Sequence, residues 1–142
     1  MSGKLFFAIG LLVVISFLAG CSSAPAGPSE IKAALGQEFT LPVGQTVTIT
    51  GEDLKFKFDE VTADSRCPKG VQCIWAGEAK VQLSITSKNS TSRVVYTVPG
   101  GSAASGQDFF NQYKAVFKLE PYPEAPQQID ASSFKLIMTI TK

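Results

Sequence analysis

Hydrophobic and polar residues alternate with a period of two over most of the chain after residue 37. In Leu54–Phe58 apolar side chains alternate with lysines, and Val81–Ile85 and Phe134–Ile140 show the same alternation with mostly polar residues. Because a period of two places successive side chains on opposite faces of an extended chain, each run predicts a strand buried on one face. Shorter runs of the same kind predict further strands at Phe39–Leu41, Val47–Ile49, Val94–Val98 and Ala115–Leu119.

Seven or eight such strands, separated by turn signals and without a long amphipathic helix, predict an all-β fold. We expect one antiparallel β-sandwich, Ig-like or barrel-like, over residues 37–142. Three prolines lie in 120–126, between the last two predicted strands, and proline lacks the N–H that a sheet requires. This segment is therefore expected to be a crossover, and the Gly- and Ser-rich stretch 99–107 is expected to be a loop.

The first 20 residues differ from the rest and predict a lipoprotein signal peptide. Lys4 precedes an apolar run, Leu5–Ala19, whose length of about 15 residues suits a secretory signal better than a membrane span. The sequence Leu-Ala-Gly-Cys that ends at Cys21 resembles the bacterial lipobox, which implies that Cys21 carries a diacylglyceryl group and an N-acyl chain such as palmitate. Residues 21–36 are then a flexible tether. The alternatives are an ordinary signal peptide followed by a chance cysteine, or an uncleaved anchor.

Composition restricts the partners that such a chain would have. Cleavage leaves 142 − 20 = 122 residues, enough for one domain with a core, and removes one of 13 basic residues, so that 12 basic side chains balance 12 acidic ones. No run of lysine and arginine resembles a nucleic-acid footprint, so we expect no nucleic-acid partner. We expect a monomer without a cofactor, held to the membrane by lipid in the cell envelope, with its domain facing the periplasm or the exterior.

The remaining cysteines, Cys67 and Cys73, predict a structural disulfide. Redox motifs place two residues between their cysteines, whereas here there are five. A zinc site usually takes four ligands from cysteine and histidine, and the chain has no histidine, so we expect no metal. An exported pair of cysteines in an oxidising compartment is expected to form a disulfide. Asp64, Pro68 and Gly70 are the turn-forming residues that would shape this loop.

Two side chains beside the disulfide each allow a structural and a functional interpretation. If a strand follows the loop, Trp75 lies on the same face as Cys73, and we expect it to pack against the disulfide. The alternative is an exposed Trp75 that contacts a sugar ring or a protein partner. We expect Arg66 to pair with a carboxylate such as Asp64 or Glu78, and the alternative is an arginine that faces a ligand.

Aromatic residues near the end of the chain allow the same two interpretations. Phe109 and Phe110, with Tyr113 and Tyr122 after them, are expected to lie at the edges of the core. The alternative is an aromatic binding patch beside the 99–107 loop.

The run Asp64–Ala79, DSRCPKGVQCIWAGEA, resembles a family of small exported bacterial and archaeal lipoproteins. They share an Asp-Ser-Arg-Cys-Pro-x-Gly-x-x-Cys-x-Trp-x-Gly core. The resemblance covers Phe39–Ile85 and, more loosely, Tyr113–Pro123 and the last strand. It implies an envelope lipoprotein with a disulfide, and it implies no particular activity.

Together these features predict a non-enzymatic, lipid-anchored envelope protein. It would present the disulfide loop, with Arg66, Lys69 and Trp75, to an envelope protein or a glycan, because a constrained loop loses less entropy on binding. Two other functions are considered. The segment 39–49, FTLPVGQTVTI, resembles the opening of chagasin-like peptidase inhibitors, although their Asn-Pro-Thr-Thr-Gly-Tyr loop is absent.

The second alternative is a carboxylate-based hydrolase. It would need acidic residues such as Asp59 and Glu60 to face each other across a cleft at about 5–10 Å. The absence of histidine excludes the common hydrolase triads, and we assign no catalytic residue.

Overall fold

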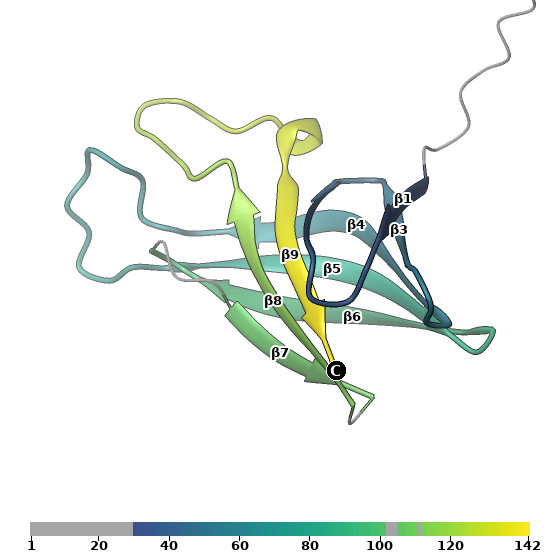
Figure 1. Ribbon diagram of the computed structural model, residues 1–142. Helices are drawn as coiled ribbons and strands as arrows, with labels where there is room; N and C mark the ends of the chain where they lie inside the picture. The colour runs from purple at the N-terminus through teal and green to yellow at the C-terminus, as the bar shows by residue number, and fades with distance from the viewer. Residues whose placement is uncertain (1–29, 102–104, 111) are drawn as a thin grey trace, which may run out of the picture.

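The computed structural model describes residues 30–101, 105–110 and 112–142, and within them it shows a sandwich of two β-sheets (Figure 1). Cys21, the signal peptide and most of the predicted tether lie outside the described residues. The described part contains nine strands and one short 3-10 helix. They are β1 (Glu30–Ala33), β2 (Glu38–Pro42), β3 (Thr46–Ile49), β4 (Leu54–Asp64), β5 (Glu78–Ser87), β6 (Ser90–Pro99), β7 (Ser105–Phe109), β8 (Tyr113–Glu120), η1 (Ala131–Ser133) and β9 (Lys135–Thr141).

The two sheets have five and four strands. The larger sheet has the order β1-β3-β4-β5-β6 and the smaller one the order β2-β9-β8-β7. All neighbouring strands are antiparallel except β1 and β3, which pair in parallel from Glu30–Thr46 to Ala33–Ile49. In Figure 1 the strands of the smaller sheet cross those of the larger one at a steep angle. The predicted all-β sandwich is confirmed.

The core lies between the two sheets and is built from the alternating positions of the strands. β4 buries Leu54, Phe56 and Phe58 and exposes the lysines between them, so the period-two pattern gives the correct inward face. β5, β8 and β9 follow the same rule. Their buried side chains are Val81, Leu83 and Ile85 in β5, Ala115, Phe117 and Leu119 in β8, and Leu136, Met138 and Ile140 in β9.

The structure corrects the predicted limits of the tether and of the 99–107 loop. β1 lies within the predicted tether, 21–36, because Ala33 is buried in the core and Glu30 accepts hydrogen bonds from Thr48 and Lys55. The sandwich therefore begins no later than Glu30, not at residue 37. β7 occupies the end of the predicted loop, and its ladder with β8 keeps a largely polar sequence extended.

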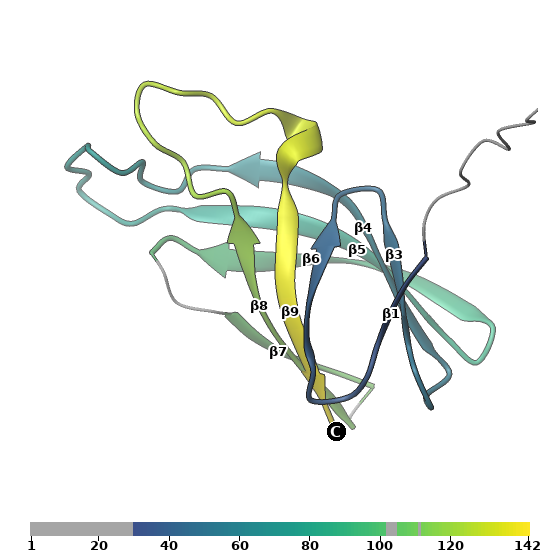
Figure 2. The ribbon, with the colours of Figure 1, turned by 45° about the horizontal axis from the view of Figure 1, so that its top comes forward.

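The predicted crossover is confirmed, since 121–134 connects β8 to β9. This segment, the β4–β5 loop (65–77) and the end of β6 lie at the same side of the molecule (Figures 1 and 2). Both views place the start of β1 on the opposite side. In the described part of the chain, no helix has the length and apolar character to cross a membrane.

The aromatic residues at the β7–β8 turn belong mainly to the core edge. Phe109 and Tyr113 are buried and stack with their ring centroids 5.8 Å apart, and Phe56 meets Phe109 edge-on at 5.2 Å. The Tyr113 hydroxyl donates to Glu52, and this hydrogen bond raises the pKa of Tyr113 and lowers the pKa of Glu52. Phe109 and Tyr113 therefore belong to the edge of the core, as expected, whereas Phe110 is 46% exposed at the turn.

Candidate functional site

The β4–β5 loop is closed by a disulfide between Cys67 and Cys73, as predicted. Within it the Val71 N–H donates to the Pro68 carbonyl at 3.3 Å, and Gly70 has a φ of +83°. Asp64 begins the loop by accepting the Arg66 backbone N–H at its Oδ1 atom, at 3.2 Å. The predicted turn roles of Asp64, Pro68 and Gly70 are therefore confirmed.

Arg66 is a buried connection between the two sheets. Arg66 is only 4% exposed. Its Nε and Nη2 atoms donate to the two carboxylate oxygens of Asp64 at 2.8 and 2.6 Å. Nη1 donates to the Leu119 carbonyl at 2.8 Å, and Nη2 also donates to the Pro121 carbonyl at 3.1 Å. Four of the five guanidinium N–H groups are thus engaged. Of the two sequence interpretations, the structural one holds, with Asp64 and not Glu78 as the partner.

The guanidinium of Arg66 closes an edge of the smaller sheet. β7 covers β8 only as far as Phe117, which pairs with Ser105. Arg66 binds the carbonyl of Leu119 near the end of β8 and the carbonyl of Pro121 just after the strand. Arg66 therefore supplies the donors that a further strand would supply, at the point where β7 has ended.

The segment after β8 packs against the disulfide loop. The Lys69 N–H donates to the Pro123 carbonyl at 2.9 Å, and the Ala125 N–H donates to the Lys69 carbonyl at 3.2 Å. Tyr122 lies between the loop and the end of β6, and its hydroxyl accepts the Gly101 N–H at 3.1 Å. The cations of Arg66 and Lys69 lie 5.0 and 5.9 Å from the centre of its ring, within cation–π range.

Close backbone contacts fix the second half of the loop, where the chain leads back into β5. The Cys67 N–H donates to the Ala76 carbonyl and the Gly100 N–H to the Gly77 carbonyl, both at 2.8 Å. Gly77 has a φ of +70°, and a Cβ atom there would lie 1.9 Å from the Ser65 carbonyl oxygen. The two sides of the loop are therefore pressed together where only glycine fits.

Trp75 does not pack against the disulfide, so the first of its two predictions is wrong. β5 begins only at Glu78, and Cys73 and Trp75 lie outside any strand, so they do not share a sheet face. Trp75 is 72% exposed, Ile74 is fully exposed and Val71 is 49% exposed. We call these three residues the loop tip. Large apolar side chains that are exposed within one short loop are candidates for an interaction site.

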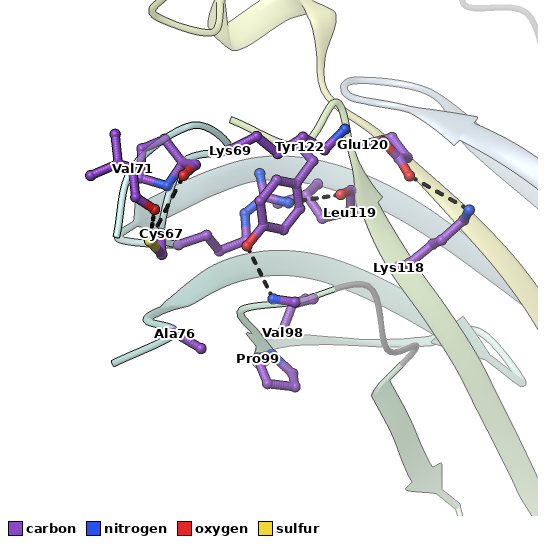
Figure 3. A pocket seen from close by; sticks show the side chains of 13 residues that line it. Cys67, Lys69, Val71, Ala76, Val98, Pro99, Lys118, Leu119, Glu120 and Tyr122 are labelled. Carbon is purple, nitrogen blue, oxygen red and sulfur yellow. Dashed lines mark hydrogen bonds and ion pairs between the residues drawn. The ribbon is translucent and has the colours of Figure 1, made fainter. Parts of the chain in front are cut away.

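Beside the loop tip, a cavity of about 490 Å³ opens between the disulfide loop and the ends of β6 and β8. Figure 3 shows Tyr122 in the middle of its lining, with the disulfide loop on one side and Lys118 and Glu120 on the other. The cavity thus joins three segments that are distant in sequence. Its lining residues are Arg66, Cys67, Pro68, Lys69, Val71, Ala76, Val98, Pro99, Gly101, Lys118, Leu119, Glu120 and Tyr122.

The arrangement offers little for carboxylate or metal chemistry. Among the described residues that line the cavity, Glu120 is the one carboxylate. Asp59, considered above for hydrolysis, accepts the Ser84 hydroxyl at 2.6 Å and lies near Lys57 and Arg93, so it is engaged on the sheet. Among the residues that the structure describes, no three Cys, Asp or Glu side chains are grouped so that they could hold a metal ion.

The chain matches no family model, no curated protein and no solved structure. The site must therefore be interpreted from its own geometry.

The predicted site residues do gather in one loop, but with different roles. Cys67, Cys73 and Arg66 shape the loop, while Lys69 and Trp75 are exposed and available to a partner. The sequence interpretation missed Ile74, whose apolar side chain in a non-periodic segment beside Trp75 was a usable signal. It also missed the cavity, because contacts between segments more than 50 residues apart leave no local pattern.

Removing the disulfide tests how far it supports the fold. The variant Cys67→Ser/Cys73→Ser is expected to lose about 2 kcal/mol of unfolding free energy, because the cross-link closes only a short loop in the unfolded chain. Urea unfolding followed by circular dichroism would measure this loss, and the native spectrum should stay that of a β-sheet protein. A variant that fails to fold would show that the disulfide is required for the whole sandwich and not only for the loop.

Proposed function

We propose that this protein is a non-enzymatic, lipid-anchored protein of the cell envelope that binds a protein partner through the loop tip. The observation that carries the proposal is the exposure of Val71, Ile74 and Trp75 on a loop that a disulfide and Arg66 hold in shape. A loop held in this way loses little conformational freedom when a partner covers it. Aromatic residues in central, desolvated positions contribute most to the affinity of protein interfaces.

A protein fits the loop tip better than a glycan does. Sugar recognition combines an aromatic face with polar groups that bind hydroxyls, whereas the neighbours of Trp75 at the tip, Ile74 and Val71, are apolar. Apolar side chains of this kind gain from burial in a partner's hydrophobic surface, at about 25 cal/mol per Å².

The position of the loop agrees with a lipid anchor at Cys21. The start of β1, from which the tether would lead to the membrane, and the β4–β5 loop lie on opposite sides of the molecule (Figures 1 and 2). A domain held at its first strand can therefore direct the loop tip away from the bilayer. The support for the anchor itself is the Leu-Ala-Gly-Cys sequence after an apolar run.

Peptidase inhibition is the second candidate, and the grouping of loops favours it. The disulfide loop, the β8–β9 segment and the end of β6 lie at one side of the sandwich and contact one another. Such a group could enter an active-site cleft as a wedge. Assays of cysteine and serine peptidases with the purified domain would distinguish an inhibitor from a binding module for other envelope proteins.

Substitution of Trp75 tests the loop tip. Full-length protein is recovered from envelope extracts after cross-linking in intact cells, as the wild type and as Trp75→Ala. We expect a defined protein to be cross-linked to the wild type and its recovery to fall at least about tenfold with Trp75→Ala, since a central aromatic residue contributes roughly 2 kcal/mol or more.

Val95→Ala is the matched control, because Val95 is also apolar and exposed (53%) but lies on β6, away from the tip. It should recover the partner as the wild type does. Equal recovery by Trp75→Ala and the wild type would show that the tip does not carry the interaction, and specific recovery of glycan in place of protein would contradict the class of partner.

The anchor is tested separately with Cys21→Ser. This substitution removes the sulfur that would carry the diacylglyceryl group. If Cys21 is acylated, metabolic labelling with palmitate should mark the wild type and leave Cys21→Ser unlabelled, because a thioether cannot form without the thiol. Equal labelling of both proteins would place the lipid elsewhere.

A further inference from the structure

The cavity beside the disulfide loop has apolar walls and a volume suited to a small ligand. The lining residues Val98 and Leu119 are only 3% and 2% exposed, so the accessible apolar surface comes mainly from Pro68, Val71, Pro99 and the ring of Tyr122. Its volume of about 490 Å³ lies within the range of roughly 300–1,000 Å³ that small-molecule sites occupy. An organic group of about ten to fifteen heavy atoms would therefore be accommodated.

The charges that line the cavity are mainly positive. Arg66, Lys69 and Lys118 face one carboxylate, Glu120, while Asp64 and Glu124, which pair with Arg66 and Lys69, are not part of the lining. Four of the five guanidinium N–H groups of Arg66 are already engaged and the residue is buried, so the two exposed lysines are the cations that a ligand can reach.

Both lysines can exchange their present partners for a ligand. Lys69 lies 3.2 Å from Glu124 and Lys118 lies 3.5 Å from Glu120, and the four side chains are between 33% and 64% exposed. Ion pairs at such exposed positions contribute about 0–1 kcal/mol, so giving one up costs little.

We propose that this cavity binds an amphiphilic organic anion, with an apolar body in contact with Tyr122, Pro99 and Val71 and one carboxylate held by Lys69 or Lys118. The apolar walls bind the body by burial, and the lysines select the charged end. Val71 is shared with the loop tip, but Ile74 and Trp75 do not line the cavity, so the inference goes beyond the proposed protein-binding function.

The walls are held in place before any ligand arrives. Tyr122 is fixed by the Gly101 N–H at its hydroxyl and by two cations at its ring. Arg66 fixes Leu119 and Pro121 on either side of Glu120. A preformed site of this kind has little ordering cost, so even a small probe should show measurable binding.

The probe is 2-naphthoate, an apolar bicycle with one carboxylate, and 2-naphthamide is its neutral counterpart of nearly equal shape. The protein is residues 22–142, which retain all nine described strands and the described core, so the sandwich can form without the signal peptide. Titrations are followed by ¹⁵N–¹H NMR. We expect saturable shifts at Tyr122, Val98 and Lys118, with about fivefold weaker binding of the amide.

Charge variants separate the lysines from general hydrophobic binding. Lys69→Gln and Lys118→Gln should each raise the Kd for 2-naphthoate about two- to fivefold and leave the Kd for 2-naphthamide unchanged. The control is Lys114→Gln, an exposed lysine on the same strand β8 that does not line the cavity, and it should bind both probes as the wild type does.

The carboxylate could belong to a free organic acid or to the end of a polypeptide. Acetyl-Ala-Phe with a free carboxyl group, compared with its C-terminal amide, distinguishes these sources. Tighter binding of this peptide acid than of 2-naphthoate assigns a chain terminus, and weaker binding assigns a free acid. Equal affinity for naphthoate and naphthamide, shifts centred away from the cavity, or no saturation at millimolar concentration would each overturn the proposal, whatever the Trp75→Ala experiment shows.

Discussion

Replacement of Arg66 with alanine is expected to lower the free energy of unfolding by about 3–5 kcal/mol. The substitution leaves the Asp64 carboxylate, whose side chain is only 18% exposed, without its cation. It also leaves the carbonyls of Leu119 and Pro121 without their donor at the open edge of β8, and unpaired buried polar groups are costly. Since small domains are stable by about 5–15 kcal/mol, one side chain would account for a large share.

Arg93→Ala is the matched control for Arg66→Ala. Arg93 is the only other arginine in the chain, its side chain is 69% exposed, and its nearest carboxylate oxygen, on Asp59, is 3.8 Å away. It should lose no more than about 1 kcal/mol. Urea unfolding followed by circular dichroism would compare the two variants. Equal losses would contradict the view that Arg66 joins the sheets, and Arg66→Lys should recover only part of the loss, because an ammonium cannot bind both carboxylate oxygens and both carbonyls.

Gly77→Ala is expected to destabilise the protein by about 4 kcal/mol or more, a loss that few single substitutions reach. The new Cβ would lie 1.9 Å from the Ser65 carbonyl oxygen and 2.7 Å from its carbon. Because these are backbone atoms, no side-chain rotation can relieve the overlap. The two sides of the loop must separate, which breaks the backbone hydrogen bonds between Cys67 and Ala76 and between Ser65 and Glu78.

Gly51→Ala separates the overlap from the backbone conformation. Gly51 has a φ of +84°, close to that of Gly77, but a Cβ there would meet no atom within 4 Å. This variant should therefore show only the cost of a left-handed alanine, about 1–2 kcal/mol. Unfolding midpoints in urea provide the comparison. If the two alanine variants lose the same stability, the loop is more adaptable than its contacts indicate.

The strands that the sequence predicts correctly are those with an unbroken alternation of apolar and polar residues. In Leu54–Phe58 and Phe134–Ile140 every second side chain is buried. The sequence of such a strand identifies its inward face even when the neighbouring strand is unknown. β1 and β7 were missed for the opposite reason. Their sequences, EIKA and SGQDF, are short and mostly polar, and they are extended because β3 and β8 supply hydrogen-bond partners.

The site could be predicted only as far as its contacts are local in sequence. The disulfide and the Asp64–Arg66 pair lie within a few residues of each other, and both were expected. The position of Trp75 depended on where β5 begins, and β5 starts at Glu78, five residues after Cys73, where the prediction required it to have begun. The cavity depends on contacts of Arg66 with carbonyls 53 and 55 residues away, which no pattern within the loop reveals.

The exposure of Trp75 also determines what the protein's intrinsic fluorescence can report. Trp75 is the single tryptophan of the chain and is 72% exposed, so its indole emission should already be that of a hydrated ring in the native protein. Melting of the sheets would change this emission little, whereas occupation of the loop by a partner would remove water from the ring and shift the emission to the blue. The emission wavelength of Trp75 should therefore change when a partner binds and change little when the protein unfolds.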